Sequence, residues 1–448
     1  MLRNIAMIKI SPFFVAIFWY ISLFPGRLPF DSSDAIRMIK RGESTEQWTP
    51  LFFWLLRITT LEGTMIWLSS ALLCSGFFYA FKFLIDSLNF ANLRKAKMIH
   101  LAITLFPVYG FWSVTVSHDS TFLIGFVMAL AILIRSSNKG SDISIRHNLF
   151  AVSLLLTSWV GYVIVILFLI SLATVKMRYV SVVALSTLAL SLISQIGITS
   201  TRPDVVFRPA LVDIKCAVQH PDSIITKDTW SRLEAIAPRD QWLSQTSCAS
   251  MDKAVQTLYT GSNSLDNLQW REVAPVYLQL LSDNPAIILM GHIQRSSVAL
   301  PPLLFQPPKN QVSWNLDRPV GEGTNTMLQQ GPEVVHPSVD EPSVDLSFPG
   351  SKVVEIPAQL LGFLVNQASW FWGWGGLWLL PTFYMIQTRL KRSHVKKIIS
   401  LHILLFHAIL FALMPDPTPR YVLPSILLGF FSTCVILIDR RLPNKTKS

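Results

Sequence analysis

Side chains that can move a proton or bind a phosphate stand in three short polar segments between apolar stretches of the chain. Asp31 and Asp34 follow the first apolar stretch, His118 and Asp119 lie between two later ones, and Arg420 precedes the last. A carboxylate can take a proton from a hydroxyl group, and an arginine can hold a phosphate. Single polar residues at such turns are more often ordinary loop residues. The prediction of a group-transfer site therefore depends on all of them meeting at one side of a membrane.

Membrane-spanning helices are the elements that must position these residues. Of the 448 residues, 51% are hydrophobic and 15% are charged, and the mean hydropathy is +0.44. Several apolar runs reach the length of a helix that crosses a bilayer. The sequence therefore predicts an all-α polytopic membrane protein and excludes a soluble fold.

The basic residues are distributed unevenly along the chain. Six segments assigned to the cytoplasm, around 1–10, 86–97, 135–146, 175–178, 389–397 and 439–448, carry 19 Lys or Arg against 3 Asp or Glu. The remaining residues carry 19 against 24, although the whole chain has a net charge of +11. This bias is typical of cytoplasmic loops in membrane proteins, so it indicates topology and not a nucleic-acid-binding face.

The first apolar stretch, Ile10 to Phe24, has two interpretations. Its length and basic start fit a cleaved signal peptide as well as a short membrane span. We favour the span, because Phe24-Pro25-Gly26 lacks the small residues of a cleavage site. The protein is then expected in the cytoplasmic membrane with about ten spans and both termini inside. They cover 10–24, 64–85, 100–116, 121–134, two within 148–175, 180–198, 356–387, 398–414 and 421–438.

The segment from Asn148 to Val175 decides the topology. Its 28 residues are long for one span and short for two. A single crossing places the basic clusters at 389–397 and 439–447 outside, against the charge bias. We therefore predict two short, tilted helices that turn near Trp159 to Tyr162.

The sequence predicts that the chain has four parts. They are membrane helices in 1–200, an extracytoplasmic helical insert in 201–305, a Pro-rich flexible linker in 306–355, and the last membrane helices with a basic tail in 356–448. The polar region 201–355 carries 12 Lys or Arg against 17 Asp or Glu. Thr226 and the pair Asn284-Pro285 are predicted to begin helices there. Cys216 and Cys248 either form one disulfide in an oxidising compartment or remain buried thiols.

Aromatic and histidine residues add candidates for support roles. Trp48 leads into an apolar segment with Pro50 at its start, which predicts an interfacial helix on the outer surface. Trp372 belongs to a tryptophan cluster that either grips a sugar or lipid or, as we favour, forms an interfacial belt. His402 and His407 in the ninth span are predicted to be packed core residues, with a polar relay as the alternative.

Several of these segments together resemble bacterial multi-pass glycosyltransferase-like proteins of the GT-C type. The resemblance is carried by PGRLPFDSSDAI followed by WTPLFFWLL, by SHDSTF, by PRYVLP, and by the insert segments CAVQHPDSIITKDTWSRLEAIAPRDQW and NPAIILMGHIQRSSVALPP. It implies transfer of a sugar from a polyprenyl-phosphate donor to a cell-envelope glycan or similar acceptor on the outer face of the membrane.

The resemblance also implies roles for individual residues. Asp31 matches the family's first-loop aspartate, the general base, whereas Asp34 is a backup that the motif does not match. Asp119, beside His118, matches the second acidic position, which orients the acceptor or a cation. Arg420, followed by Tyr421, matches a position suited to the donor phosphate. The sequence departs from the family at Trp48-Thr49, which leaves acceptor and metal handling open.

The chemistry requires no tightly bound cofactor, because a lipid phosphate is already an activated leaving group. A divalent cation remains open, and the metal ligands are unknown. Three other functions also remain open. A polysaccharide polymerase or ligase uses a diphosphate-linked donor, a transporter has charged or broken helices near mid-span, and an envelope scaffold uses Asp31 only as a loop residue.

Overall fold

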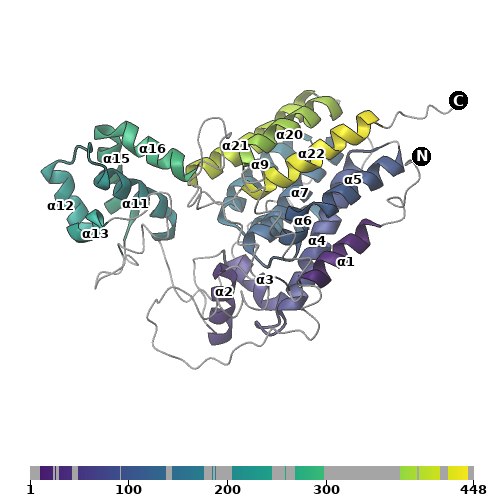
Figure 1. Ribbon diagram of the computed structural model, residues 1–448, viewed down its shortest axis with the longest axis horizontal. Helices are drawn as coiled ribbons and strands as arrows, with labels where there is room; N and C mark the ends of the chain where they lie inside the picture. Colours follow the sequence, from purple (N-terminus) through teal and green to yellow (C-terminus); the bar gives the residue numbers. More distant parts are fainter. Residues whose placement is uncertain are drawn as a thin grey trace.

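The computed structural model describes residues 11–23, 26, 30–42, 49–90, 92–137, 144–175, 184, 187, 204–244, 258, 268–296, 374–390, 393–413 and 422–441. The elements in these ranges are all α-helices (Figure 1). The predicted linker 306–355, the span 180–198 apart from two residues, and the first part of the span 356–387 lie outside the described residues.

Most of the described helices form one bundle. Its members are α1 (Pro12–Ser22), α4 (Ile66–Ser87), α5 (Leu93–Leu105), α6 (Pro107–Ser113), α7 (His118–Ser137), α8 (Ile145–Leu155), α9 (Trp159–Val175), α20 (Gly375–Arg389), α21 (Ser393–Leu413) and α22 (Leu423–Arg441). By length and composition, α4, α7 and α21 can each cross a membrane, and α1, α9 and α22 are shorter apolar helices. The chain is thus an all-helical membrane protein, while the number of ten spans stays a prediction.

Helix α7 lies at the centre of this bundle. It packs against α4, α8, α9, α21 and α22, and 89% of its most apolar stretch is buried inside the protein. For α21 the corresponding share is 39%. A helix that is apolar on all sides is suited to such a position. The beginning of α7 therefore belongs to a helix that is largely enclosed by its neighbours.

The predicted third span, 100–116, is two helices in the structure. Helix α5 begins earlier, at Leu93, and ends before Pro107, where α6 begins. Phe106 between them has an extended backbone with φ −67° and ψ 121°. Proline has no N–H group and disfavours helical geometry in the residue before it, so a helix ends there.

The first polar segment is a helix, α2 (Phe30–Arg41), where we expected a loop that carries Asp31 and Asp34. Ala35, Ile36 and Ile39 of α2 are buried. Their spacing is that of one face of a helix, and this face packs against α3 (Pro50–Thr59).

Helix α3 begins as predicted, with a proline in its first turn. The side chain of Thr49 accepts a hydrogen bond from the backbone N–H of Phe52, at 3.3 Å, and so caps the helix. Its position in the membrane interface remains a prediction.

The prediction of two helices between Asn148 and Val175 is confirmed. Helix α8 ends at Leu155 and α9 begins at Trp159. A Cβ atom at Gly161 would collide with the carbonyl oxygen of Leu155, so the close turn requires a glycine there.

The insert is helical, as predicted, and has its own core. Its described helices are α11 (Asp204–Gln219), α12 (Lys227–Ile236), α13 (Arg239–Leu243), α15 (Trp270–Asp283) and α16 (Pro285–Arg295). Trp242 is fully buried among them, and its indole N–H donates to the carbonyl oxygens of Leu233 and Ala237. In Figure 1 this group stands at the left and meets the bundle where α16 approaches the end of α21.

The two predicted helix starts in the insert differ in detail. The Thr226 side chain accepts a hydrogen bond from the backbone N–H of Thr229, so it caps α12 as predicted. Pro285 begins α16, but the side chain of Asn284 pairs with both backbone groups of Ile224, at 2.7 and 2.9 Å. The helices α15 and α16 are apolar enough to be one broken span by composition, with a bend of 108° between them.

Candidate functional site

Three of the predicted site residues, His118, Asp119 and Cys216, are described with their side chains. Asp31 and Asp34 lie on α2, where the structure describes the backbone of these two positions and not their side chains. The residues that lie outside the description altogether are Trp48, Trp372, Arg420, Tyr421 and Cys248. Cys216 is disulfide-bonded, and its expected pairing with Cys248 stays a prediction.

His118 and Asp119 occupy the first turn of α7, which begins at the segment we expected to be a turn. The imidazole Nε2 lies 3.3 Å from Oδ1 of Asp119, and the two side chains are 22% and 14% exposed. A carboxylate at the start of a helix is stabilised by the helix dipole. The pair is thus mostly enclosed but still reachable from one side.

The His118 ring is fixed by an aromatic neighbour on α3. It meets Phe52 edge to face, with ring centroids 5.6 Å apart. Its other nitrogen, Nδ1, is buried and makes no hydrogen bond within the described residues. A buried imidazole nitrogen without a partner is unfavourable unless a ligand or water meets it, so this atom is a candidate contact for a substrate.

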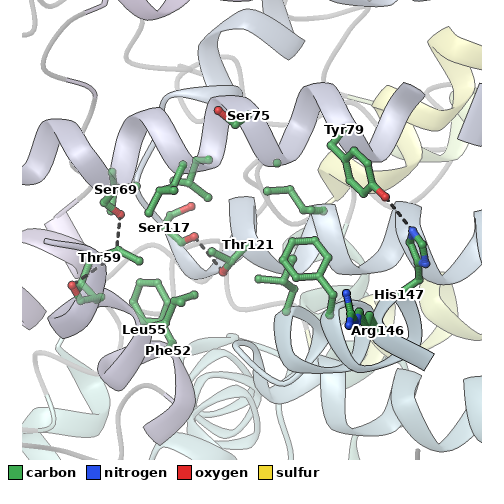
Figure 2. A pocket seen from close by; sticks show the side chains of 18 of the residues that line it. Phe52, Leu55, Thr59, Ser69, Ser75, Tyr79, Ser117, Thr121, Arg146 and His147 are labelled. Carbon is green, nitrogen blue, oxygen red and sulfur yellow. Dashed lines mark hydrogen bonds between the residues drawn. The ribbon is translucent and has the colours of Figure 1, made fainter. Parts of the chain in front are cut away.

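An apolar cavity of about 830 Å³ lies beside this pair, between α3, α4, α7 and α8 (Figure 2). Phe52 lines the cavity and also touches His118. Ser117 and Thr121, which flank the pair in sequence, line it as well. The cavity and the His118–Asp119 pair are therefore parts of one candidate site.

The cavity has a polar group of hydroxyls near the pair. Thr59 donates to Ser69 at 3.0 Å, and Thr121 shares a hydrogen bond with Thr157 at 2.7 Å. These hydroxyl groups form hydrogen bonds with one another, so an apolar ligand in the cavity does not leave them without partners. Between this end and the opposite one, the lining is aliphatic and aromatic: Leu55, Leu56, Leu72, Leu73, Ile124, Phe150 and Leu154.

The opposite end of the cavity carries residues that the sequence analysis did not single out as site residues. Tyr79 and Nε2 of His147 share a hydrogen bond of 2.8 Å, and Arg146 lies beside them (Figure 2). Along α4, the ten residue steps from Ser69 to Tyr79 rise about 15 Å, roughly half the thickness of a hydrocarbon core. The cavity therefore has the length and lining for a hydrocarbon chain that lies along the helices.

The described part of the chain contains no group of three His, Cys, Asp or Glu side chains placed to hold a metal ion. His118 and Asp119 supply two possible ligands at most. Whether the site uses a divalent cation thus stays open.

His402 and His407 are buried in the bundle, as expected for packed core residues. His402 lies 3.1 Å from the hydroxyl of Ser171, and His407 lies 2.5 Å from that of Ser425. Neither lines the cavity. No described contact joins them to His118, so the structure gives no support for a polar relay to the site within the described residues.

The fold and this site define an all-helical membrane protein with an apolar cavity beside a carboxylate and an imidazole. No protein-family model and no curated protein matches the sequence. Among solved structures, the chain is similar to the crystal structure of ArnT from Cupriavidus metallidurans bound to undecaprenyl phosphate. The two are 12% identical, with 94% of this chain and 75% of that chain covered and a TM-score of 0.29. A TM-score of that size carries no argument about this chain.

Proposed function

We propose that this protein is a membrane glycosyltransferase that moves a sugar from a polyprenyl-phosphate donor to a cell-envelope glycan or similar acceptor. The observation that carries the proposal is the apolar cavity of about 830 Å³ that adjoins the His118–Asp119 pair. A long hydrocarbon tail fits the lining, and proton-accepting groups stand at the end where a lipid headgroup would emerge.

The reaction would be a displacement at the anomeric carbon of the sugar. The acceptor hydroxyl oxygen forms the new bond, the bond between that carbon and the phosphate oxygen breaks, and the lipid phosphate leaves with the electron pair. A carboxylate takes the hydroxyl proton. In this proposal Asp31 is the general base, and Asp119 orients the acceptor or a cation with Asp34 as the backup base.

The negative charge that develops on the leaving phosphate needs a cation or aligned dipoles. Arg420, with Tyr421 beside it, is proposed for this role. The positive end of the α7 dipole supports the same charge from the side of the cavity. Trp48 and Trp372 would support the acceptor or the sugar. Water and the acceptor would reach the site from the outer face of the cytoplasmic membrane.

A transfer assay with the full chain in lipid nanodiscs tests this proposal. Radiolabelled polyprenyl-phosphate sugars are offered with membrane acceptors to the wild type, Asp31→Asn and Asp119→Asn. The matched control is Asp86→Asn, because Asp86 lies in the last turn of α4, is 52% exposed and pairs only loosely with Lys82 at 3.6 Å. General-base removal typically costs about 10²- to 10⁴-fold in rate.

We expect turnover to fall by that range in Asp31→Asn, to fall in Asp119→Asn, and to remain unchanged in Asp86→Asn. Loss in Asp119→Asn with full activity in Asp31→Asn would move the base to Asp119. Absence of transfer from every monophosphate donor, together with transfer from a diphosphate-linked oligosaccharide, would replace the proposal with a polymerase or ligase.

A further inference from the structure

A carbonyl group in the last turn of helix α21 is bound by side chains of the insert. The last four carbonyl groups of an α-helix have no partner within the helix. One of them, in α21, is that of Phe411. It accepts two hydrogen bonds from the insert: Nε2 of His292 donates at 2.9 Å and Oγ of Ser296 donates at 2.7 Å.

The two donors stand together at the end of α16. His292 lies in its last turn and Ser296 directly follows it, with the backbone N–H of Ser296 donating to the carbonyl oxygen of His292 at 2.9 Å. This spacing of four residues places the two side chains on the same side. The His292 ring also meets the Phe411 ring edge to face, with centroids 5.2 Å apart. Helix α16 of the insert therefore caps α21 of the bundle with two side chains and one ring contact.

The His292 ring is held by contacts on both of its nitrogens. A carbonyl oxygen only accepts, so Nε2 carries the proton in the contact with Phe411. Nδ1 lies 2.9 Å from Nη2 of Arg295 and 3.2 Å from Oδ2 of Asp213. One ring nitrogen thus donates to the bundle, and the other is held by the insert.

A buried ion pair lies next to Nδ1 of His292 and holds the ring in place. Arg295 is fully buried, Asp213 on α11 is 2% exposed, and the guanidinium donates to the carboxylate. Tyr277 on α15 lies close to the same carboxylate, and burial, followed by the charge of Asp213, raises the pKa of its phenol. Because three insert helices meet at this cluster, it has little freedom to rotate away from Phe411.

We infer that His292 and Ser296 are positioning residues, which dock the insert on the end of α21 and set where the segment after α21 begins. That segment, 414–421, contains the residues proposed for the donor phosphate, Arg420 and Tyr421. The kinetic consequence rests on the proposed function, whereas the docking contact does not. With the cap lost, we expect the last turn of α21 to fray and the lipid donor to bind more weakly.

Two variants separate a positioning role from a merely structural one. His292→Phe/Ser296→Ala removes both donors to Phe411 and keeps a ring of similar shape. It also removes the Nδ1 contacts with Arg295 and Asp213, whose own ion pair remains. His292→Gln keeps an N–H group that can reach the carbonyl oxygen. The control is Arg232→Gln, because Arg232 makes an exposed ion pair with Asp228 on α12, and this pair involves no residue of α21.

The first readout is hydrogen–deuterium exchange of the full chain in nanodiscs, which requires no activity. We expect faster exchange at the end of α21 in the double variant and wild-type exchange in α12. Two hydrogen bonds of ordinary strength correspond to a change of up to about thirtyfold. His292→Gln should recover most of the protection, and Arg232→Gln should show no change. Wild-type exchange of α21 in the double variant would overturn the inference.

The second readout is the transfer assay described above. We expect KM for the lipid donor to rise about tenfold in the double variant with kcat within twofold, and His292→Gln to restore KM. An equal fall of kcat with unchanged KM would contradict the positioning role. If the wild type itself transfers nothing, the proposed function fails, and the exchange experiment still decides whether the insert is docked through His292 and Ser296.

Discussion

Substitution of Gly76 by leucine tests whether the cavity holds a lipid chain. Gly76 lies on the cavity face of α4, opposite Ile124 of α7. A Cβ atom at this position would lie 2.9 Å from Cδ1 of Ile124, the far end of a flexible side chain, so a small shift can accommodate it. Leucine also has a higher helix propensity than glycine. The substitution should therefore fill the cavity and leave the fold intact.

The expected effect follows from the number of carbon atoms displaced. The leucine side chain adds four carbons to a space that a lipid chain would otherwise occupy. With about 0.8 kcal/mol for each buried CH₂ group, the loss of binding free energy is about 3 kcal/mol, or roughly a hundredfold in affinity. A chain that shifts along the cavity recovers part of this loss, so the value is an upper limit.

The assay measures binding of a polyprenyl phosphate without sugar to the purified chain, and then KM for the sugar donor. The control is Ala71→Leu, because Ala71 lies about 140° around α4 from Gly76 and does not line the cavity. Unchanged affinity in Gly76→Leu, or an equal loss in both variants, would refute the assignment of the cavity to the lipid tail.

Two further predictions concern charges away from the cavity. Burial lowers the pKa of Lys215 in the insert to about 8, against 10.5 for the free side chain. The unfolded chain thus binds the proton more tightly, and the insert should become more stable between about pH 8 and pH 10, by at most about 3 kcal/mol, in the wild type but not in Lys215→Met. Thermal melts of the wild type and of Lys215→Met across this pH range test the prediction, and a parallel pH dependence of stability in the two proteins would contradict it. Asp439 pairs with Lys95 at 3.0 Å and with Arg389 at 2.6 Å, so Asp439→Asn should lower the melting temperature, and Lys95→Met/Asp439→Asn should regain most of the loss. A double variant less stable than Asp439→Asn would show that the buried lysine is held by other contacts.

Local signals in the sequence predicted the helix starts well. Thr49-Pro50 and Thr226 begin helices because a hydroxyl cap and a first-turn proline act within three or four residues. The division of 148–175 into two helices was also predictable, since it followed from the side on which basic residues must lie. These predictions required no knowledge of which helices pack together.

Features that depend on packing could not be predicted in this way. The cavity exists because four helices leave a space between them, and neither Gly76 nor Tyr79 differs locally from other residues of an apolar helix. The contact of His292 with Phe411 joins positions 119 residues apart. Even Pro107, which is visible in the sequence, lies inside the predicted span 100–116. Proline is tolerated in membrane helices when neighbours satisfy the freed backbone groups, so its presence alone does not predict the break between α5 and α6.

The positions of the candidate residues indicate how the proposed site would be assembled. His118 and Asp119 stand at the start of α7, which packs against α4, α8, α9, α21 and α22, so their positions are set by the core. The segment with Asp31 belongs to α2, which packs on α3, and the segment with Arg420 follows α21, which the insert caps. In the proposed function, a substrate that reaches all three meets one part in the bundle core and two parts next to helices that are held by contacts at its rim. Opening of these rim contacts, a few hydrogen bonds and one apolar face, would let the site adjust to an acceptor without movement of α7.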